Sequence, residues 1–408
     1  GGSRDRRGGK GYGVSMNAGA ATEPVARGAA SPPLPILVVA QTPPPVHGQA
    51  VATARFLEGA YTRIRLHHVR MAFSDEGADV GRFRLSKIGR LAGLVVRVVL
   101  ARMRTGARVL YYPPGGPSRI PFARDVVFLG LLRPLFDRVV FHFHATGVSR
   151  LYASLGPVGR ALFRRAYFEP DLAICLAPET TEDAQFIRAR RVTVVPNGVD
   201  DPGVAGKLEA RAVPPRILFV GHVRETKGVL VLLEACRKLH AHGVALELVL
   251  LGGFHPPEFE DEFRQRVASA GLAGAVRCDG EVNGADKWRA FAQAAVFCFP
   301  TYYEAETAPL ALLEAMACGL PVVATRWRGI PSIVREGVTG YLVEPRHPDA
   351  LADRLAQVLR DGPLRERLGR AGRDEYERRF TLDRHRAGME EALCSLSASP
   401  ASAGGEGR

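Results

Sequence analysis

Short, uninterrupted runs of apolar residues recur along this chain and limit the folds open to it more than any other feature. Such runs are typical of strands that helices cover on both faces of a parallel sheet. Stretches with a helical pattern separate them, and this alternation predicts parallel sheets within an α/β fold. The runs lie at residues 34–40, 109–112, 138–144, 172–176, 192–195, 216–221, 246–251, 275–278, 295–300, 321–325 and 340–343.

A Pro- and Gly-rich stretch at residues 196–215 divides the runs into two series. Two series predict two Rossmann-like, doubly wound domains that face each other, with ligands in the cleft beyond the carboxyl ends of the strands. The segments at both ends of the chain contain almost no large apolar residues, so we expect them to be disordered. The predicted parts are a leader at 1–33, an N-terminal domain at 34–200, a linker at 201–215, a C-terminal domain at 216–381, a helix at 382–396 and a tail at 397–408.

Thr381 is a plausible N-cap for that last helix, because a threonine hydroxyl can accept a hydrogen bond from the first helical turn. The helix follows the whole C-terminal domain in the sequence. We therefore consider that it could cross back to the N-terminal domain.

The net charge of +13 is distributed unevenly. Residues 1–200 contain 28 Lys and Arg against 14 Asp and Glu, whereas residues 201–408 contain 27 against 28. A basic half favours an anionic partner such as nucleic acid, anionic lipid or a phosphorylated acceptor, although a genome that favours arginine explains part of the excess. No aromatic–basic RNA motif or helix–turn–helix pattern is present, so we do not expect a nucleic-acid partner.

Residues 83–104 form the most basic apolar segment, with an Arg or Lys every turn or two. Two interpretations stay open. A basic amphipathic helix can lie in an anionic membrane surface. It can equally pack on a sheet and extend its arginines into solvent.

The six cysteines form no C-x-x-C pair, and most lie in apolar runs. This pattern predicts buried thiols in a reducing compartment. No apolar run approaches the ~20 residues that cross a bilayer, and no signal-peptide pattern is present. We therefore expect a cytoplasmic protein, with peripheral contact to the inner face of the membrane still open.

The strongest local signal is the segment 299–321, which runs from a strand end through a loop into a helix. Glu306 lies in the loop, and Glu314 lies two predicted helical turns further on, inside an apolar stretch. An unpaired buried carboxylate costs several kcal/mol or shifts its pKa. A ligand hydroxyl is therefore a natural partner for Glu314. The alternative is a surface helix with two acidic residues by chance.

The start of the same helix suits a phosphate group. Pro309 fits the first helical turn, where a missing N–H has no cost. The free N–H groups around Thr307, Ala308 and Leu310 could then face an anion.

The second signal is the segment 219–230, in which a strand ends, a tight loop follows and a helix begins at Gly228. His222, Arg224 and Lys227 lie in this loop. The pattern places their side chains at the carboxyl edge of the sheet, where doubly wound folds bind ligands. The alternative is a solvated charged loop.

The two acids at this spacing, together with the basic loop, resemble the retaining glycosyltransferases of family 4, which have the GT-B fold. The resemblance covers roughly residues 34–396. It implies that Glu306 contacts the donor sugar, Glu314 binds the ribose, and Lys227 holds the donor diphosphate. His222 stands where the family has an arginine, and Arg224 is a candidate to supply the missing charge.

Weaker matches agree with this resemblance. Gly48 corresponds to a glycine-rich loop near the donor phosphates, Gly252 to a glycine pair beside the nucleotide, and His144 to a histidine near the transferred sugar. His142 and His144 share one side of a strand by alternation, and a histidine pair can bind metal. No further ligand lies nearby and no Asp-x-Asp occurs, so we expect neither a metal nor a cofactor.

The resemblance implies retaining transfer of a sugar from a nucleotide-diphosphate donor, UDP or GDP, to a glycan, lipid-linked or other acceptor. Synthesis of a bacterial cell-surface polysaccharide or glycolipid is the expected setting. A nucleotide-sugar epimerase of the same fold is the main alternative. A basic nucleic-acid-binding protein is a further one.

Overall fold

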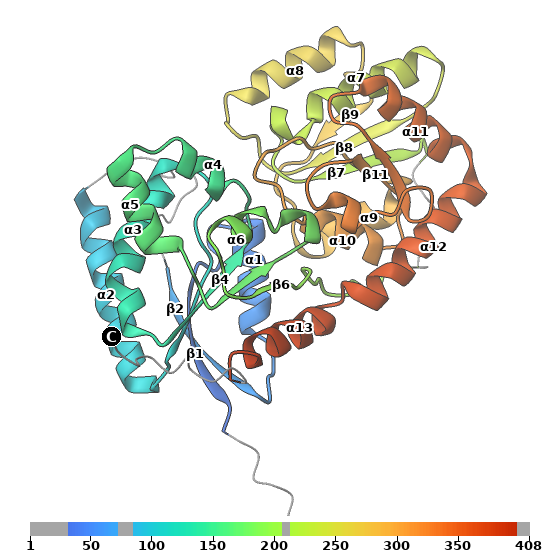
Figure 1. Ribbon diagram of the computed structural model, residues 1–408. Helices are drawn as coiled ribbons and strands as arrows, with labels where there is room; N and C mark the ends of the chain where they lie inside the picture. The colour runs from blue at the N-terminus through green and yellow to red at the C-terminus, as the bar shows by residue number, and fades with distance from the viewer. Residues whose placement is uncertain (1–31, 72–84, 206–212, 398–408) are drawn as a thin grey trace, which may run out of the picture. The chain divides into compact units, whose positions relative to one another are not determined.

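The computed structural model describes residues 32–71, 85–205 and 213–397. It contains two six-stranded sheets whose described ladders are all parallel. The strand order is β2-β1-β3-β4-β5-β6 in the first sheet and β12-β11-β10-β7-β8-β9 in the second. Helices connect the strands in both sheets (Figure 1). The predicted α/β class with two doubly wound parallel sheets is confirmed.

The N-terminal half, residues 34–200, holds the first sheet. Its strands are β1 (Leu34–Ala40), β2 (Ile64–Arg70), β3 (Val109–Tyr112), β4 (Arg138–Phe143), β5 (Leu172–Cys175) and β6 (Val192–Val194). Its helices are α1 (Gly48–Leu57), α2 (Leu85–Thr105), α3 (Arg119–Leu132), η2 (Arg133–Leu135), α4 (Val148–Ala153), α5 (Pro157–Tyr167), η3 (Pro178–Thr180) and α6 (Glu182–Phe186).

The C-terminal half, residues 216–381, holds the second sheet. Its strands are β7 (Arg216–Val220), β8 (Glu247–Leu251), β9 (Val276–Cys278), β10 (Val296–Phe299), β11 (Val322–Thr325) and β12 (Gly340–Val343). Its helices are η4 (Glu225–Lys227), α7 (Val229–Ala241), α8 (Phe259–Ser269), α9 (Gly284–Gln293), α10 (Leu310–Ala317), η5 (Ile330–Ser332), α11 (Pro348–Arg360) and α12 (Gly362–Arg379). The last helix, α13 (Leu382–Cys394), follows these elements.

β1 shows why the apolar runs predicted the sheets correctly. Leu37 and Val39 belong to one apolar cluster, whereas Ile36 and Val38 belong to another. Alternate side chains of a strand point to opposite faces, so a strand covered on both faces must be apolar throughout.

The sequence analysis did not predict β2. This strand lies at the edge of the first sheet, and only Ile64 and Val69 are buried in it. Its arginines and histidines interrupt the apolar pattern. An edge strand has neighbours on one side only, so burial constrains fewer of its residues.

α13 packs on the first sheet although it follows the second in sequence (Figure 1). The Thr381 side chain accepts a hydrogen bond from the N–H of Arg384, which confirms the predicted N-cap. Met389 and Leu393 join the apolar cluster of Ile36 and Val38. This last helix therefore joins the N-terminal half to the end of the C-terminal half.

The packing of α2 bears on whether residues 83–104 form a helix that lies on a membrane or one that packs on a sheet. Leu94 and Val98 are buried against the core of the first sheet, so one side of the helix packs as a structural element. The opposite side stays exposed, including Val96 and Met103. Residues 83 and 84 lie outside the described residues, as do most of the predicted leader and tail. Within the described ranges, no helix has the length and apolar character needed to cross a bilayer.

A buried carboxylate links three elements of the N-terminal half. Asp125 of α3 accepts hydrogen bonds from the hydroxyls of Tyr112 and Tyr167, at 2.6 and 2.9 Å, and from the N–H of Gly115 at 2.7 Å. Arg124 pairs with the same carboxylate. Because every donor faces a fully buried acid, removal of the acid leaves several polar groups without a partner.

We expect Asp125→Ala to lower the free energy of unfolding by about 3–5 kcal/mol, since it removes the buried carboxylate that pairs with Arg124 and accepts from two buried hydroxyls. Urea unfolding followed by circular dichroism would measure this change. Asp137→Ala is the control, because Asp137 is exposed and pairs with the exposed Arg108; its cost should stay below about 1 kcal/mol. Equal costs in the two variants would contradict this account of Asp125.

Candidate functional site

The basic loop after β7 leads into η4 and places Lys227 at the carboxyl edge of the second sheet. Gly228 follows with a φ of 78°, and a Cβ there would lie 2.0 Å from the carbonyl oxygen of Pro300. Only glycine combines this backbone conformation with such a close approach. Gly228 therefore lets the loop after β7 pass directly beside the end of β10. α7 begins at Val229, with Gly228 as its N-cap rather than its first residue.

Lys227 and Glu306, which lie far apart in sequence, form an ion pair. The Nζ of Lys227 lies 2.5 Å from the Oε2 of Glu306, and the hydroxyl of Thr301 donates to the same oxygen at 3.1 Å. The ammonium also lies 5.2 Å from the ring centroids of Phe299 and Tyr303. Glu306 is only 8% exposed. The structure thus brings together the predicted diphosphate ligand and the predicted sugar ligand.

Arg224 and His222 contribute differently to this edge. The Arg224 guanidinium stacks over the Tyr303 ring at 4.8 Å, next to Lys227. Burial, followed by the charges of His255 and Lys227, lowers the pKa of His222 below its usual 6.5. His222 is therefore neutral at pH 7, and Arg224 rather than His222 adds positive charge beside Lys227.

Glu314 has partners that the sequence analysis missed. It is 4% exposed, and the Nζ of Lys287 lies 2.8 Å from Oε1 and 2.7 Å from Oε2. A guanidinium nitrogen of Arg55 lies 3.9 Å from Oε1. The sequence analysis offered a ligand hydroxyl as the partner of this buried acid and did not identify these two side chains. Lys287 and Arg55 come from α9 and α1, and no motif marks either of them.

The helix that carries Glu314 also begins later than expected. α10 starts at Leu310 with Pro309 as its N-cap, so Pro309 precedes the first turn. Glu314 therefore lies little more than one turn into the helix, not two. The reason is that residues 306–309 stay in the loop, where Thr307 and Ala308 make contacts outside the helix.

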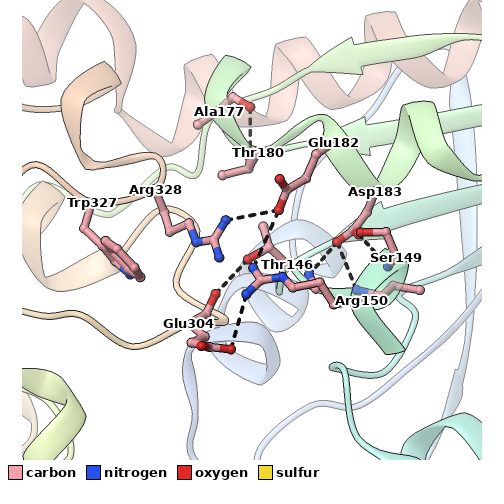
Figure 2. Close-up of polar contacts among 12 residues, drawn as sticks. Thr146, Ser149, Arg150, Ala177, Thr180, Glu182, Asp183, Glu304, Trp327 and Arg328 are labelled. Atoms are coloured by element: carbon pink, nitrogen blue, oxygen red, sulfur yellow. Dashed lines mark hydrogen bonds and ion pairs between the residues drawn. The ribbon is translucent and has the colours of Figure 1, made fainter. Parts of the chain in front are cut away.

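Three hydrogen bonds tie this loop to the N-terminal half. The Thr146 hydroxyl donates to the carbonyl oxygen of Glu304 at 3.0 Å (Figure 2). The Thr307 hydroxyl donates to the carbonyl oxygen of His144 at 2.9 Å. The side-chain amide of Asn197 donates to the carbonyl oxygen of Ala308 at 3.0 Å. The backbone on both sides of Glu306 is thus held from the N-terminal half.

Ion pairs lie beside the hydrogen bond between Thr146 and Glu304 (Figure 2). Arg150 pairs with Glu304 at 3.2 Å, and Arg328 pairs with Glu182 at 3.1 Å, so each half supplies one arginine. The buried carboxylate of Asp183 accepts from the N–H groups of three consecutive residues, Gly147, Val148 and Ser149. Asp183 therefore orders the turn that presents Thr146 to Glu304.

The predicted histidines lie together at the end of β4. The ring centroids of His142 and His144 are 4.1 Å apart, which confirms that they share one side. The hydroxyl of Tyr111 lies 2.5 Å from the Nδ1 of His142. Burial, and then the nearby His385 and His47, lower the pKa of His144 to about 3. Burial also brings the pKa of His142 well below 6.5, so both rings are neutral at physiological pH.

The two predicted glycines differ in what surrounds them. Gly252 has a φ of 144°, and a Cβ there would lie 2.0 Å from the carbonyl oxygen of Gly221, so the loops after β7 and β8 approach closely. Gly48 starts α1, and no hydrogen bond or ion pair among the described residues links it to Lys227 or Glu306. Across the same residues, no group of three or more His, Cys, Asp or Glu side chains could hold a metal ion.

Comparison with known protein families finds a match to the part of the chain that contains these residues. The model of the family described as glycosyl transferases group 1 matches residues 205–375, which include Lys227, Glu306 and Glu314. This stretch of the chain has the sequence pattern of the group 1 glycosyl transferases. This confirms the resemblance found in the sequence.

Two curated relatives illustrate the range of proteins that this chain resembles. A protein of Salmonella typhimurium that carries the name colanic acid biosynthesis glycosyltransferase WcaL is 30% identical over 254 residues, 60% of this chain. A phosphatidyl-myo-inositol mannosyltransferase of Mycobacterium leprae is 33% identical over 188 residues, 45% of this chain. The matched regions span 60% and 48% of the lengths of these relatives.

A solved structure agrees with the fold of this chain. Anabaena Alr3699/HepE in complex with UDP-glucose superposes with a TM-score of 0.68 at 19% identity, and the match covers 90% of this chain and 100% of that one. At this identity the similarity establishes the fold alone, and the fold is GT-B.

The buried histidines predict how the stability of this protein depends on pH. The pKa values of His142, His144 and His385 all lie below 6.5 in the folded state, mainly because of burial. The unfolded chain therefore binds more protons, so stability is full above pH 6.5 and is lost as the pH falls from there toward 3. We expect a slope of up to about 1.4 kcal/mol per pH unit for each buried histidine.

Urea unfolding at pH 7, 6 and 5 would measure this slope, and His142→Gln should reduce it. The matched control is His347→Gln, which changes an exposed histidine. An equal reduction of the slope in both variants would contradict the assignment to buried imidazoles.

Proposed function

We propose that this chain is a retaining glycosyltransferase that moves a sugar from a nucleotide diphosphate to an acceptor hydroxyl. The observation that carries the proposal is the Lys227–Glu306 pair at the carboxyl edge of the second sheet. Its loop is held by Thr146 and His144 of the other half. A phosphate-binding cation and a sugar-binding carboxylate thus lie side by side where the two halves of the chain meet.

The donor would be a UDP- or GDP-sugar. Lys227 and Arg224 supply two positive charges for the diphosphate, and the N–H groups from Thr307 to Leu310 offer further donors. Glu314, which pairs with Lys287, would accept hydrogen bonds from the ribose. A group 1-like fold with UDP-glucose bound, that of HepE, agrees with a uridine donor.

The chain's own residues account for the transfer step as follows. The bond between the anomeric carbon and the diphosphate oxygen breaks, and its electron pair leaves with the diphosphate. Lys227 and Arg224 stabilise that growing negative charge. The acceptor oxygen attacks from the same face, and its proton passes to the departing phosphate. Glu306 orients the sugar, while the neutral His144 borders the sugar site without giving up a proton.

The proposed acceptor is a glycan or a lipid-linked sugar at the cytoplasmic face of a membrane. Relatives named for colanic acid biosynthesis and for mannosyl transfer to phosphatidyl-myo-inositol support this class of acceptor. No metal or cofactor is assigned to the reaction.

The roles of the two acids and the lysine can be separated by mutation. Because Glu306 neutralises Lys227 in this structure, Glu306→Gln should keep or strengthen the affinity for free nucleoside diphosphate while transfer falls. Glu314→Gln should weaken binding of both the nucleotide and its sugar. Lys227→Ala should cost about 10²–10³-fold in kcat, as loss of a charge-stabilising donor does.

Calorimetry with nucleoside diphosphate and turnover with the sugar donor would measure both effects. Glu304→Gln is the matched control, because Glu304 lies in the same loop with an exposed side chain. If Glu306→Gln abolished nucleotide binding while Glu314→Gln left it intact, the two roles would be reversed. Release of an epimerised sugar without an acceptor would identify an epimerase instead.

We expect transfer to survive EDTA. Lys227 and Arg224 can neutralise the negative charge of the diphosphate, which a metal ion does in other glycosyltransferases. The measurement is turnover before and after chelation, with Mg²⁺ or Mn²⁺ added back. Complete loss on chelation, reversed by either ion, would refute charge neutralisation by these two side chains.

A further inference from the structure

The turn after β11 contains an arginine in a backbone conformation that arginine rarely adopts. Arg328 has a φ of 49°, in the left-handed region that favours glycine. Its side chain is 18% exposed, and its Nε is buried with no hydrogen-bond partner among the described residues. Both features cost free energy, and such costs persist where the surrounding structure imposes them, often at functional sites. Arg328 is therefore a candidate for a role beyond packing.

The two sequence neighbours of this arginine hold a loop segment of the candidate site at both of its ends. The indole N–H of Trp327 donates to the carbonyl oxygen of Tyr303 at 2.8 Å. Gly329 packs against the other end, where a Cβ would lie only 2.4 Å from the carbonyl oxygen of Thr307. Glu306 lies within the segment that these two contacts hold.

Arg328 itself contacts the N-terminal half (Figure 2). Its Nη1 lies 3.1 Å from the Oε1 of Glu182, the first residue of α6. The next residue along α6 is Asp183, which orders the turn that presents Thr146 to the backbone of Glu304. Arg328 thus joins the contacts that hold the loop from the C-terminal half to those that hold it from the N-terminal half.

Stability alone does not account for this ion pair. The side chain of Glu182 is 47% exposed, and ion pairs with so much access to water add little to the free energy of unfolding. The strained backbone and the unpartnered Nε of Arg328 therefore have no matching gain in stability. A gain in the geometry of the site would offset them.

We propose that Arg328 is a positioning residue that fixes the loop of Glu306 for the donor sugar. Its ion pair with Glu182 keeps the turn at 327–329 against this loop when a diphosphate takes Lys227 away from Glu306. Arg328 acts through the loop and not by touching the donor. The role rests on the proposed transfer reaction, because it concerns the carboxylate that would orient the sugar.

Arg328→Gly separates positioning from folding, since glycine adopts a φ of 49° without strain while the ion pair is lost. We expect kcat to fall about tenfold or more, because a displacement of ~1 Å near the reacting groups can cost about 10²-fold. The Kd of free nucleoside diphosphate, which lacks the sugar, should stay unchanged. Arg328→Lys should recover most of the lost rate, since Arg328 donates a single hydrogen bond to Glu182.

Turnover, calorimetry with nucleoside diphosphate and circular dichroism would measure these effects. Unchanged kcat in Arg328→Gly, or a loss of nucleotide affinity that matches the loss of kcat, would overturn the positioning role. Absence of transfer by the unmodified protein would instead contradict the proposed function. The two failures are therefore distinguishable.

Glu182→Gln tests the same contact from the N-terminal half and leaves the turn at 327–329 unchanged in sequence. Arg150, which also lies 3.8 Å from Glu182, keeps its pair with Glu304. The kcat of this variant should fall like that of Arg328→Gly. The double variant should lose no more than about either single variant, because both remove one interaction. Additive losses would overturn the coupling.

A fluorescence test needs neither donor nor acceptor. The chain contains two tryptophans, so Trp288→Phe leaves Trp327 as the sole reporter. The ring of Trp327 lies 5.3 Å from the guanidinium carbon of Arg328. Glu182→Gln changes a residue of the other half, and it should shift the emission to longer wavelength as the turn loosens and water reaches the indole. No shift would overturn the coupling between the halves.

Arg188→Gly is the matched control. Arg188 also has a left-handed φ, of 56°, and it is exposed in the N-terminal half. The control therefore makes the same exchange of residue at the same kind of backbone position. Its kcat and its Trp327 emission should match those of the unmodified protein. If it lost as much rate as Arg328→Gly, backbone freedom rather than the ion pair would explain the effect.

Discussion

The ion pair between Lys227 and Glu306 is the interaction on which the site depends. Both side chains are largely buried, and a buried ion pair is stable only when its geometry and remaining hydrogen bonds are good. Thr301 supplies one such bond, and Gly228 permits the close approach of the two loops. The structure thus pairs the cation proposed to bind phosphate with the carboxylate proposed to face the sugar. A donor diphosphate would have to compete with that carboxylate for the lysine.

The N-terminal half positions the loop that carries Glu306. Asp183 orders the turn at Gly147–Ser149, Thr146 then holds the backbone of Glu304, and His144 accepts from Thr307. These contacts fix the backbone of the loop rather than its carboxylate. Glu306 therefore remains available to a ligand while its position is set from both halves of the chain.

The excess positive charge lies on helices of the N-terminal half, away from the pair of Lys227 and Glu306. α2, α3 and α5 present arginines and exposed apolar side chains, whereas the first turn of α8 in the C-terminal half carries three acids. The exposed arginines and apolar side chains thus lie in one half, and most of the residues proposed to bind the nucleotide lie in the other.

The sequence by itself determined the parallel sheets, the N-cap at Thr381 and the order of the basic loop and the two acids. Burial on both faces forces a strand to be apolar throughout, and spacing along one loop is read directly from the chain. Only the tertiary structure decided that Lys287 and Arg55 pair with Glu314, that β2 completes the first sheet, and that α10 starts at Leu310. Each of these depends on residues distant in sequence. Long-range packing leaves no periodic pattern in the chain, so no local signal could reveal it.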